Sequence, residues 1–276
     1  MYKKFLIVAS KLDKAGINIT SQLSQFKKNP LASVLQQSEK GFDFYLVEKE
    51  IIFTENLNHE KINNYDFIIF ASKHRSEKGE KAITIHTPGN PKEAKFGGEA
   101  GKICRTSAIF QKQLFDKLNK NAEKYELREY DITLEATHHG PLIDKPCIFV
   151  EIGSTDTEYN DRRAGFVVAK TISEAIEEFK ESPYNEVAVA VGGPHYCPNF
   201  NKIQLMSNIA ISHVIPAYSL PLTDELITEA IRKTEEEVDF VVVDWKGLGK
   251  AEERNEIVKI LERNYLQWKK TSEINR

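Results

Sequence analysis

Histidine is concentrated in short loops that follow apolar, strand-like runs of this chain. Four of the seven histidines lie in such loops, each near glycine or proline: His86, His138, His139 and His195. Loops at strand ends are where sheet proteins commonly keep their functional groups. Because imidazole both binds metal ions and moves protons near neutral pH, this placement makes an enzyme the leading class of function.

The adjacent pair His138-His139 is the strongest local signal. On a regular strand, neighbouring side chains point to opposite faces, so the two rings could not reach one centre. A Gly-Pro pair follows, however, and a turn there would let one or both rings face a pocket. The alternative is that one ring is a hydrogen-bonded structural group.

His86 and His195 each adjoin a turn. A Pro-Gly pair bends the chain after His86, which places the ring at a rim, where its alternative role is to stabilise the turn. Gly192 and Gly193 precede His195, and paired glycines allow close backbone approach and offer their amides to an anion. The chain has neither a dinucleotide-binding nor a P-loop glycine motif.

Glu151 lies inside the apolar run 147–152, where a carboxylate needs a metal ion, a histidine or an arginine as partner. A purely structural ion pair is the alternative. The next polar residues, Ser154 and Thr155, are expected to cap a helix rather than to act as nucleophiles, and Thr155 is also a candidate substrate contact. No Gly-x-Ser-x-Gly nucleophile motif occurs.

Three histidines with one carboxylate form a ligand set that suits zinc. The candidates are spread along the chain, without a spacing motif such as His-Glu-x-x-His. Zinc is therefore expected only if the strand ends converge.

Cys197 has no assigned base and is not expected to be a nucleophile, while His59, His74 and His213 are read as surface or core residues.

Apolar runs alternate with segments of helical periodicity. The expected strands are Phe5–Ser10, Phe42–Val47, Phe67–Ser72, Ala82–His86, Tyr130–Leu134, Cys147–Ile152, Val187–Val191, His213–Ala217 and Phe240–Trp245. The expected helices are Ser107–Asn121, Arg163–Phe179, Leu222–Thr234 and Glu253–Leu266. Continuously apolar strands are typical of sheets buried on both faces. We expect one α/β domain over residues 1–276, with three layers and a mixed, largely parallel sheet flanked by helices.

The composition is that of an ordinary globular protein, with 276 residues of which 41% are apolar and 29% charged. No apolar run approaches the roughly 20 residues of a membrane span, and the short N-terminal run reads as a buried strand rather than a signal peptide. Three widely spaced cysteines without a Cys-x-x-Cys pair indicate a reducing, cytoplasmic compartment.

Charge is unevenly distributed, although the net charge is only −3. Residues 73–105 carry eight Lys and Arg against four acids, whereas residues 224–239 carry seven acids against two bases. The first stretch is either a phosphate-facing patch or a mixed, solvated loop. Residues 87–105 lack periodicity and follow His86 directly, which favours an active-site flap or a substrate-contacting loop.

Four segments together resemble the archaeal and plant type of D-aminoacyl-tRNA deacylase. They are Ile-His-Thr-Pro-Gly-Asn at 85–90, Glu-Ala-Thr-His-His-Gly-Pro at 135–141, Val-Glu-Ile-Gly-Ser-Thr at 150–155 and Gly-Gly-Pro-His-Tyr at 192–196. The opening residues 8–16 and the length agree as well. The resemblance implies a monomeric, zinc-dependent, cytoplasmic enzyme that hydrolyses the ester between a D-amino acid and tRNA, with a fold related to phosphorylases and peptidyl-tRNA hydrolases.

Given that chemistry, roles can be assigned to the candidate residues. The expected ligands of one or two Zn²⁺ ions are His86, His138 and Glu151, with or without His195. A water molecule bound to the metal would become hydroxide near neutral pH. Glu151 is also counted as catalytic, and His139 is the expected general acid or base. The expected substrate contacts are Gly192, Gly193 and Thr155 at the reacting end and Lys92, Lys95, Lys102 and Arg105 along the acceptor stem.

Other readings stay open at this point. One is a metal-free deacylase, in which backbone groups exclude the L-side chain and a substrate hydroxyl helps to activate water. A second is a hydrolase or phosphorylase-like enzyme on a free small molecule, which would need no basic patch. The third is a tRNA-binding protein without catalysis, which would bind tRNA but hydrolyse neither enantiomer.

Overall fold

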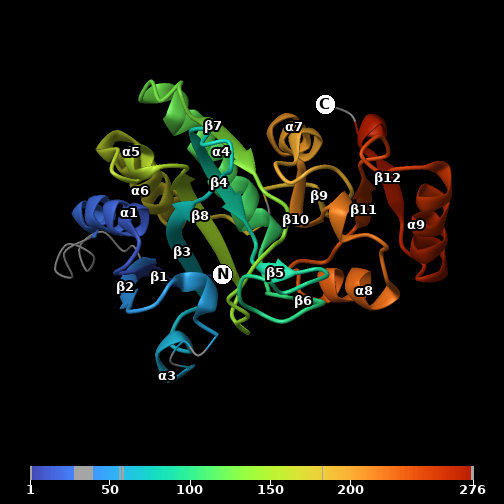
Figure 1. Cartoon of the computed structure of the whole chain (residues 1–276), viewed down its shortest axis with the longest axis horizontal. Helices are drawn as coiled ribbons and strands as arrows, with labels where there is room; N and C mark the ends of the chain where they lie inside the picture. The colour runs from blue at the N-terminus through green and yellow to red at the C-terminus, as the bar shows by residue number, and fades with distance from the viewer. Residues whose placement is uncertain (1, 28–39, 56, 58, 182, 275–276) are drawn as a thin grey trace.

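The computed structural model describes residues 2–27, 40–55, 57, 59–181 and 183–274 (Figure 1). These residues form a six-stranded sheet in the order β2-β1-β3-β8-β4-β7, a four-stranded sheet in the order β10-β9-β11-β12, and a small ribbon, β5-β6. The two larger sheets lie side by side, and one apolar cluster includes residues of both, for example Ile7 and Val242.

The strands of the larger sheet are β1 (Lys4–Ser10), β2 (Gly41–Val47), β3 (Phe67–His74), β4 (Ala82–His86), β7 (Asp131–Leu134) and β8 (Cys147–Gly153). The smaller sheet contains β9 (Glu186–Val191), β10 (Ile209–Ile215), β11 (Phe240–Val243) and β12 (Trp268–Lys270). The ribbon pairs β5 (Gly89–Asn90) with β6 (Lys102–Ile103).

The helices are α1 (Lys14–Leu23), α3 (His59–Ile62), α4 (Ala108–Lys124), α5 (Asp156–Tyr159), α6 (Arg162–Glu178), α7 (Pro198–Met206), α8 (Asp224–Arg232) and α9 (Ala251–Arg263). Short 3₁₀ turns occur at η1 (Ser24–Phe26), η2 (Ile51–Phe53), η3 (Ala217–Ser219) and η4 (Thr271–Glu273). None of the helices described is long and apolar enough to cross a bilayer.

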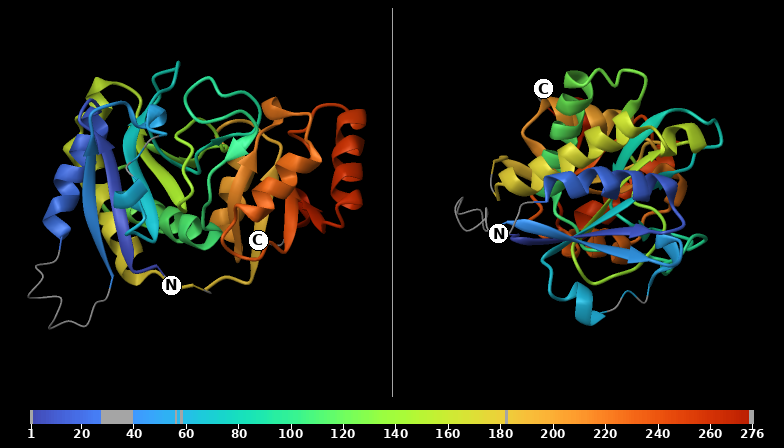
Figure 2. Two further views of the ribbon diagram at one scale, coloured as in Figure 1. Left: turned by 90° about the horizontal axis from the view of Figure 1, so that it is seen from below. Right: turned by 90° about the vertical axis from the view of Figure 1, so that its left-hand side faces the viewer.

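Helices cover one face of the larger sheet. The side chains of α1, α4 and α6 pack with Phe5, Ile69 and Val150 in the main apolar cluster. Figure 2 shows α1 and α6 lying next to each other along this face. The opposite face carries Val8, Phe70 and Phe149 and is covered in part by the chain around η2 and α3.

One strand reverses the direction of the larger sheet. Strands β2, β1, β3 and β8 are parallel, β4 runs antiparallel to β8, and β7 is parallel to β4. The carboxyl ends of β3 and β8 therefore lie at the opposite edge from those of β4 and β7. The expected mixed, largely parallel sheet is confirmed.

Most of the expected elements are confirmed to within a few residues, and Ala82–His86 is matched at both ends. The run expected as a strand at 213–217 is wrong in its limits, since β10 covers Ile209–Ile215 and ends before Pro216, which has no N–H to donate. Helices α1 and α7 were not expected. The β-branched residues and Gly16 of α1 give a weak helical signal, and tertiary packing overrides it.

Candidate active site

The chemically active residues lie on one face of the larger sheet. Register places Ser72 and Thr84 on either side of Glu151, and His86 opposite Phe149. Since side chains alternate between faces along a strand, these residues and His74 share the face that the long helices leave free. The site therefore forms across the sheet rather than at the strand ends of one edge.

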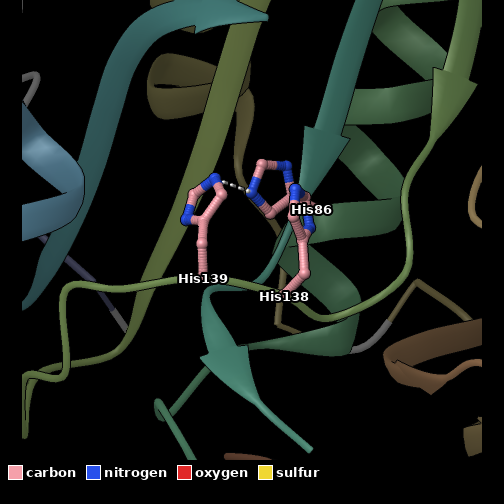
Figure 3. Close-up of side chains that lie close together, drawn as sticks. All are labelled: His86, His138 and His139. Carbon is pink, nitrogen blue, oxygen red and sulfur yellow. Dashed lines mark hydrogen bonds between the residues drawn. The ribbon is translucent and has the colours of Figure 1, made fainter. Parts of the chain in front are cut away.

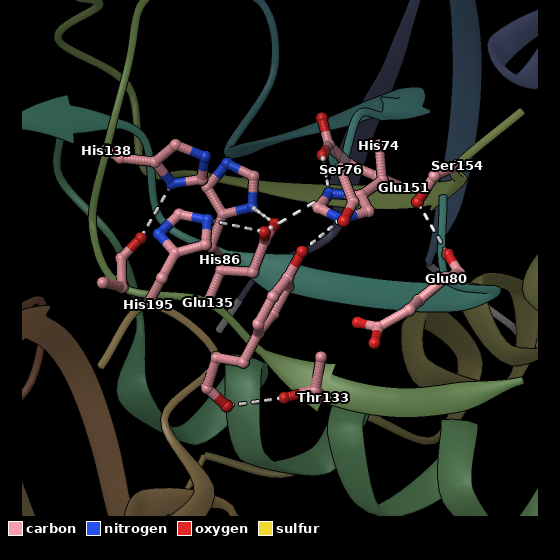
Figure 4. A network of polar contacts seen from close by, with 12 residues as sticks. His74, Ser76, Glu80, His86, Thr133, Glu135, His138, Glu151, Ser154 and His195 are labelled. Atoms are coloured by element: carbon pink, nitrogen blue, oxygen red, sulfur yellow. Dashed lines mark hydrogen bonds and ion pairs between the residues drawn. The ribbon is translucent and has the colours of Figure 1, made fainter. Parts of the chain in front are cut away.

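Glu135 is the centre of this arrangement (Figure 4). It follows β7, and its backbone N–H donates to the carbonyl of Ile85 at 3.0 Å, which places it beside His86. Its carboxylate lies 2.9 Å from Nε2 of His195, 3.2 Å from Nδ1 of His86 and 3.3 Å from Nδ1 of His74. One buried carboxylate thus joins imidazoles from both sheets.

The polar atoms around Glu135 are incompletely satisfied. Among the residues described, neither carboxylate oxygen of Glu135 nor Nδ1 of His86 makes a hydrogen bond of good geometry, although the imidazole nitrogens lie within 3.3 Å of the carboxylate. Burial alone would raise the pKa of Glu135, but the facing imidazoles of His195 and His86 hold it well below its usual range. A buried, ionised carboxylate with unfilled lone pairs is a favourable place for a cation.

His138 and His139 do face one pocket, because the backbone leaves the strand conformation. His139 has φ 44°, in the left-handed region, and this turns the two rings to the same side (Figure 3). Nδ1 of His138 lies 2.8 Å from the carbonyl of Ala136, and Nδ1 of His139 lies 2.7 Å from that of Gly140. A carbonyl only accepts, so each Nδ1 donates and each Nε2 keeps a lone pair.

The free nitrogen of His139 lies against that of His86. The two Nε2 atoms are 3.2 Å apart, and the His86 ring stacks on Phe149 at 5.1 Å between centroids. Burial lowers the pKa of His139 to about 3 and that of His138 well below its usual value, so both are neutral at pH 7. The two Nε2 atoms are thus at hydrogen-bond distance, and since that of His139 has a lone pair, it accepts when the other carries the hydrogen.

On the other side of Glu135 lie His74 and Glu151. Nδ1 of His74 is 3.7 Å from Glu151, and its Nε2 is 3.0 Å from the hydroxyl of Tyr196. Burial raises the pKa of Glu151. Burial would lower the pKa of His74, but the hydrogen bond to Glu151 and the charge of Glu135 raise it.

Three groups of side chains bring their ligand atoms within 4.8 Å of one another: His86 with His138 and His139, Glu135 with His138 and His195, and His74 with Glu135 and Glu151. The candidate ligands therefore do come together, although across one face of the sheet and not at one set of strand ends. The proposed ligands His86, His138 and His195 share this cluster, but Glu151 lies with His74 in the third group. Glu135 belongs to both the second and the third group and so connects Glu151 to the histidines, and the ligand role of Glu151 stays a prediction.

A cavity of about 490 Å³ opens above the cluster. His138, His139 and His195 line one side of it together with the two carboxylates, and Phe53 and Phe96 line another. Phe96 belongs to the segment 87–105 and lines this cavity, while the role of that segment as a flap or substrate-contacting loop stays a prediction.

Three expected substrate contacts have structural partners. Thr155 caps α5, where its hydroxyl accepts from the Thr157 N–H, as the capping expectation required. The N–H of Gly192 donates to the carbonyl of Ile215 at 2.8 Å and is thus engaged within the fold. Gly193 has φ 77° and packs against Asp244. Their contact with substrate stays a prediction.

The basic residues divide into two pairs. Lys102 and Arg105 face acids of the negative stretch, with Lys102 3.8 Å from Glu229 and Arg105 2.6 Å from Glu235. Lys92 and Lys95 instead line a second cavity, which also reaches His138. The two stretches of opposite charge therefore partly neutralise each other. Lys92 and Lys95 line the cavity next to the site, whereas Lys73 lines the site cavity itself and lies 2.8 Å from Glu50.

Sequence reasoning missed Glu135 and His74. Glu135 directly follows an apolar strand and precedes the histidine pair by three residues, which was an available signal. His74 had no glycine or proline beside it and was read as a surface or core residue. His213 and Cys197 are buried, in agreement with a core role, and burial raises the pKa of the Cys197 thiol well above its usual value.

Comparison with known proteins agrees with this geometry. A family model described as D-aminoacyl-tRNA deacylase matches residues 61–269. This chain belongs to that family. A D-aminoacyl-tRNA deacylase of Methanocaldococcus jannaschii is 30% identical over 97% of this chain and 99% of the relative. The enzyme of the same name from Methanosarcina barkeri is 36% identical over 98% of this chain and 90% of its own length.

A solved structure shares the deacylase-family fold of this chain. The crystal structure of a conserved protein of unknown function, AF0625, superposes with a TM-score of 0.84 at 29% identity. It covers 99% of this chain, and 96% of that chain is matched. The two-sheet arrangement described above is therefore seen over essentially the full length of that protein.

Proposed function

We propose that this chain hydrolyses the ester of D-aminoacyl-tRNA and releases the free D-amino acid and tRNA. The observation that carries the proposal is the Glu135 cluster at the floor of a cavity, in a chain whose relatives are named for this reaction. The enzyme would act as a monomer in the cytoplasm, and all three of its cysteines are free and buried.

The reaction needs a water, a proton acceptor and a group that stabilises negative charge on the carbonyl oxygen. His139 supplies the acceptor: burial lowers its pKa to about 3, so the ring is neutral at pH 7, and the residue lines the cavity. When water attacks the carbonyl carbon, its proton passes to this Nε2. His86 can share that proton across 3.2 Å, and Glu135 stabilises the resulting charge. The proton then passes to the 3′-oxygen as the ester bond breaks.

The donor set also fits a zinc ion. Glu135, His138 and His195 would hold it, because the carboxylate oxygens lack aligned donors and Nε2 of His138 keeps its lone pair. When bound, zinc acidifies water and polarises a carbonyl. Glu151, expected to be a ligand, would instead fix His74 at the edge of the cluster. Lys92 and Lys95 would contact the acceptor end of tRNA.

The test compares D-tyrosyl-tRNA with L-tyrosyl-tRNA, using metal-stripped and zinc-restored protein. We expect hydrolysis of the D-ester alone, restored by zinc. His138→Ala should lose bound zinc measured by elemental analysis, whereas His139→Asn should keep it and lose about 10²–10⁴-fold in kcat.

Each outcome bears on a separate part of the proposal. Hydrolysis of neither ester with zinc present would reject the deacylase function. Full activity at zero zinc would reject the metal and favour the metal-free reading. Equal hydrolysis of both enantiomers would show an esterase that does not select the D-amino acid.

A further inference from the structure

We propose that the substrate is divided between two cavities that meet at His138. The larger cavity takes the aminoacyl side chain against a wall formed by Phe53 and Phe96. The smaller cavity takes the 5′-phosphate of the terminal nucleotide at Lys92 and Lys95. The inference rests on the proposed deacylase function and assigns the two halves of its substrate.

The larger cavity has a wall that suits an apolar group. Phe53 and Phe96 are the two phenylalanines among the exposed large apolar side chains of the described residues, at 47% and 60%. Ile51 and Ile52 continue the same wall. Exposed aromatic rings that line a cavity next to buried titratable groups are typical of a ligand contact.

The fold fixes this wall to the histidine turn. The N–H of Gly140, the residue after His139, donates to the carbonyl of Phe96 at 2.8 Å. The N–H of Gly98 donates to Glu55 at 2.6 Å. Gly97 has φ 71°, and a Cβ there would lie 1.7 Å from the carbonyl oxygen of Ile52. Only glycine fits, so Phe96 is held beside η2 at a set distance from the reacting groups.

Within the described part of the chain, the smaller cavity has no phenylalanine in its lining, whereas the larger one combines its phenylalanines with Lys73 and Arg75. It measures about 260 Å³ and is lined by Asn90, Lys92, Lys95, Thr137 and Tyr218. Nζ of Lys92 donates to a backbone carbonyl at 3.1 Å, and Lys95 pairs with Glu93 at 2.9 Å on the exposed rim. These contacts are weak enough in water for a phosphate to replace them.

His138 lines both cavities, and it is the residue at which their two chemistries meet. The hydroxyl of Tyr218 also lies 3.0 Å from Nδ1 of His195. An ester joins an apolar or polar side chain on one side to a charged nucleotide on the other. Placing its carbonyl at His138 sends the side chain to the phenylalanine wall and the phosphate to the lysines.

The test uses D-tyrosine and D-alanine esters of tRNA and of adenosine, which lacks the phosphate. Combined Lys92→Gln and Lys95→Gln should raise KM for the tRNA esters about tenfold and leave the adenosine esters unchanged. Combined Phe53→Ala and Phe96→Ala should lower kcat/KM about tenfold for both tyrosyl substrates and little for alanyl ones. Lys259→Gln and Leu205→Ala are the matched surface controls.

A binding measurement separates this layout from the reaction itself. The probes are 3′-amide analogues of D-tyrosyl-adenosine with and without a 5′-phosphate. One outcome is that the wild-type protein binds these probes while hydrolysing no ester, with the lysine variants weakening only the phosphorylated probe and the phenylalanine variants weakening both. In that case the deacylase function fails and the layout stands. A lysine effect on the adenosine ester, a phenylalanine effect independent of the side chain, or no binding would overturn the layout.

Discussion

Glu135 and Asp244 each follow directly after a strand, one in each of the two sheets, yet their surroundings differ. Each is a buried carboxylate, 2% exposed, directly after an apolar strand. Asp244 accepts hydrogen bonds from the Asn199 amide at 3.0 Å and from the Gly247 N–H at 3.3 Å. Glu135 faces three imidazoles and accepts no aligned hydrogen bond from the residues described.

The difference shows what distinguishes a structural carboxylate from a functional one. The partners of Asp244 are neutral amides that satisfy its oxygens, so this carboxylate holds a turn together. The partners of Glu135 are titratable groups from three other segments, each able to move a proton or bind a cation. The sequence pattern, an acid directly after a strand, is the same in both places. Only the side chains that surround each carboxylate in the fold distinguish Glu135 from Asp244.

The largest effect is expected from Glu135→Gln. The amide keeps the size of the side chain but removes the charge that faces the imidazoles, so kcat should fall by about 10²–10⁴-fold. Steady-state hydrolysis of D-tyrosyl-tRNA measures this, with a thermal melt as the control for folding. A fall below tenfold in a folded variant would place Glu135 in the same structural class as Asp244.

A smaller effect of another kind is expected from Asp244→Asn. One acceptor becomes a donor, which leaves a buried polar group unpaired and lowers the free energy of unfolding by about 1–3 kcal/mol. Urea unfolding measures the loss. Activity per folded molecule should stay within about threefold, and a loss as large as that of Glu135→Gln would contradict the comparison.

The smallest effect near neutral pH concerns His213, a buried imidazole of the smaller sheet, whose contribution grows as the pH falls. Burial lowers its pKa to about 3. Between pH 6.5 and 3 the imidazole is protonated in the unfolded chain but stays neutral in the folded protein. The free energy of unfolding therefore decreases as the pH decreases, by at most about 1.4 kcal/mol per pH unit. His213→Asn should flatten the pH dependence of urea unfolding below pH 6.5. An unchanged slope would show that the imidazole ionises within the fold.

The sequence identified the histidines that lie in loops because glycine and proline mark those loops. It could not identify the partners of Glu135, since these depend on the strand order β3-β8-β4-β7 and on the reversal at β4. Continuous apolar runs also concealed the alternation that places Thr84, His86 and Glu151 on one face. Register is set by pairing between distant segments, which no local pattern encodes.

The charge pattern met the same limit. The basic stretch 73–105 leaves open a phosphate-facing patch or a mixed, solvated loop, and in the fold Arg105 pairs with Glu235 of the acidic stretch. Only the tertiary structure separates Lys102 and Arg105, which face acids of the stretch 224–239, from Lys92 and Lys95, which line a cavity. Helix and strand limits, by contrast, follow from local periodicity and were largely correct.

The strand order gives the two carboxylates of the site unequal mobility. Glu151 lies on β8, which is paired on both sides, whereas Glu135 follows β7, the last strand of its sheet. Edge strands open locally at lower free energy than central ones, so their amides exchange hydrogen sooner. The residues after Glu135 are held from the other side, because the N–H groups of Ala136 and Thr137 donate to the carbonyls of His195 and Val214. Opening of β7 would therefore disturb the contact between the two sheets, whereas Glu151 would keep its neighbours on β3.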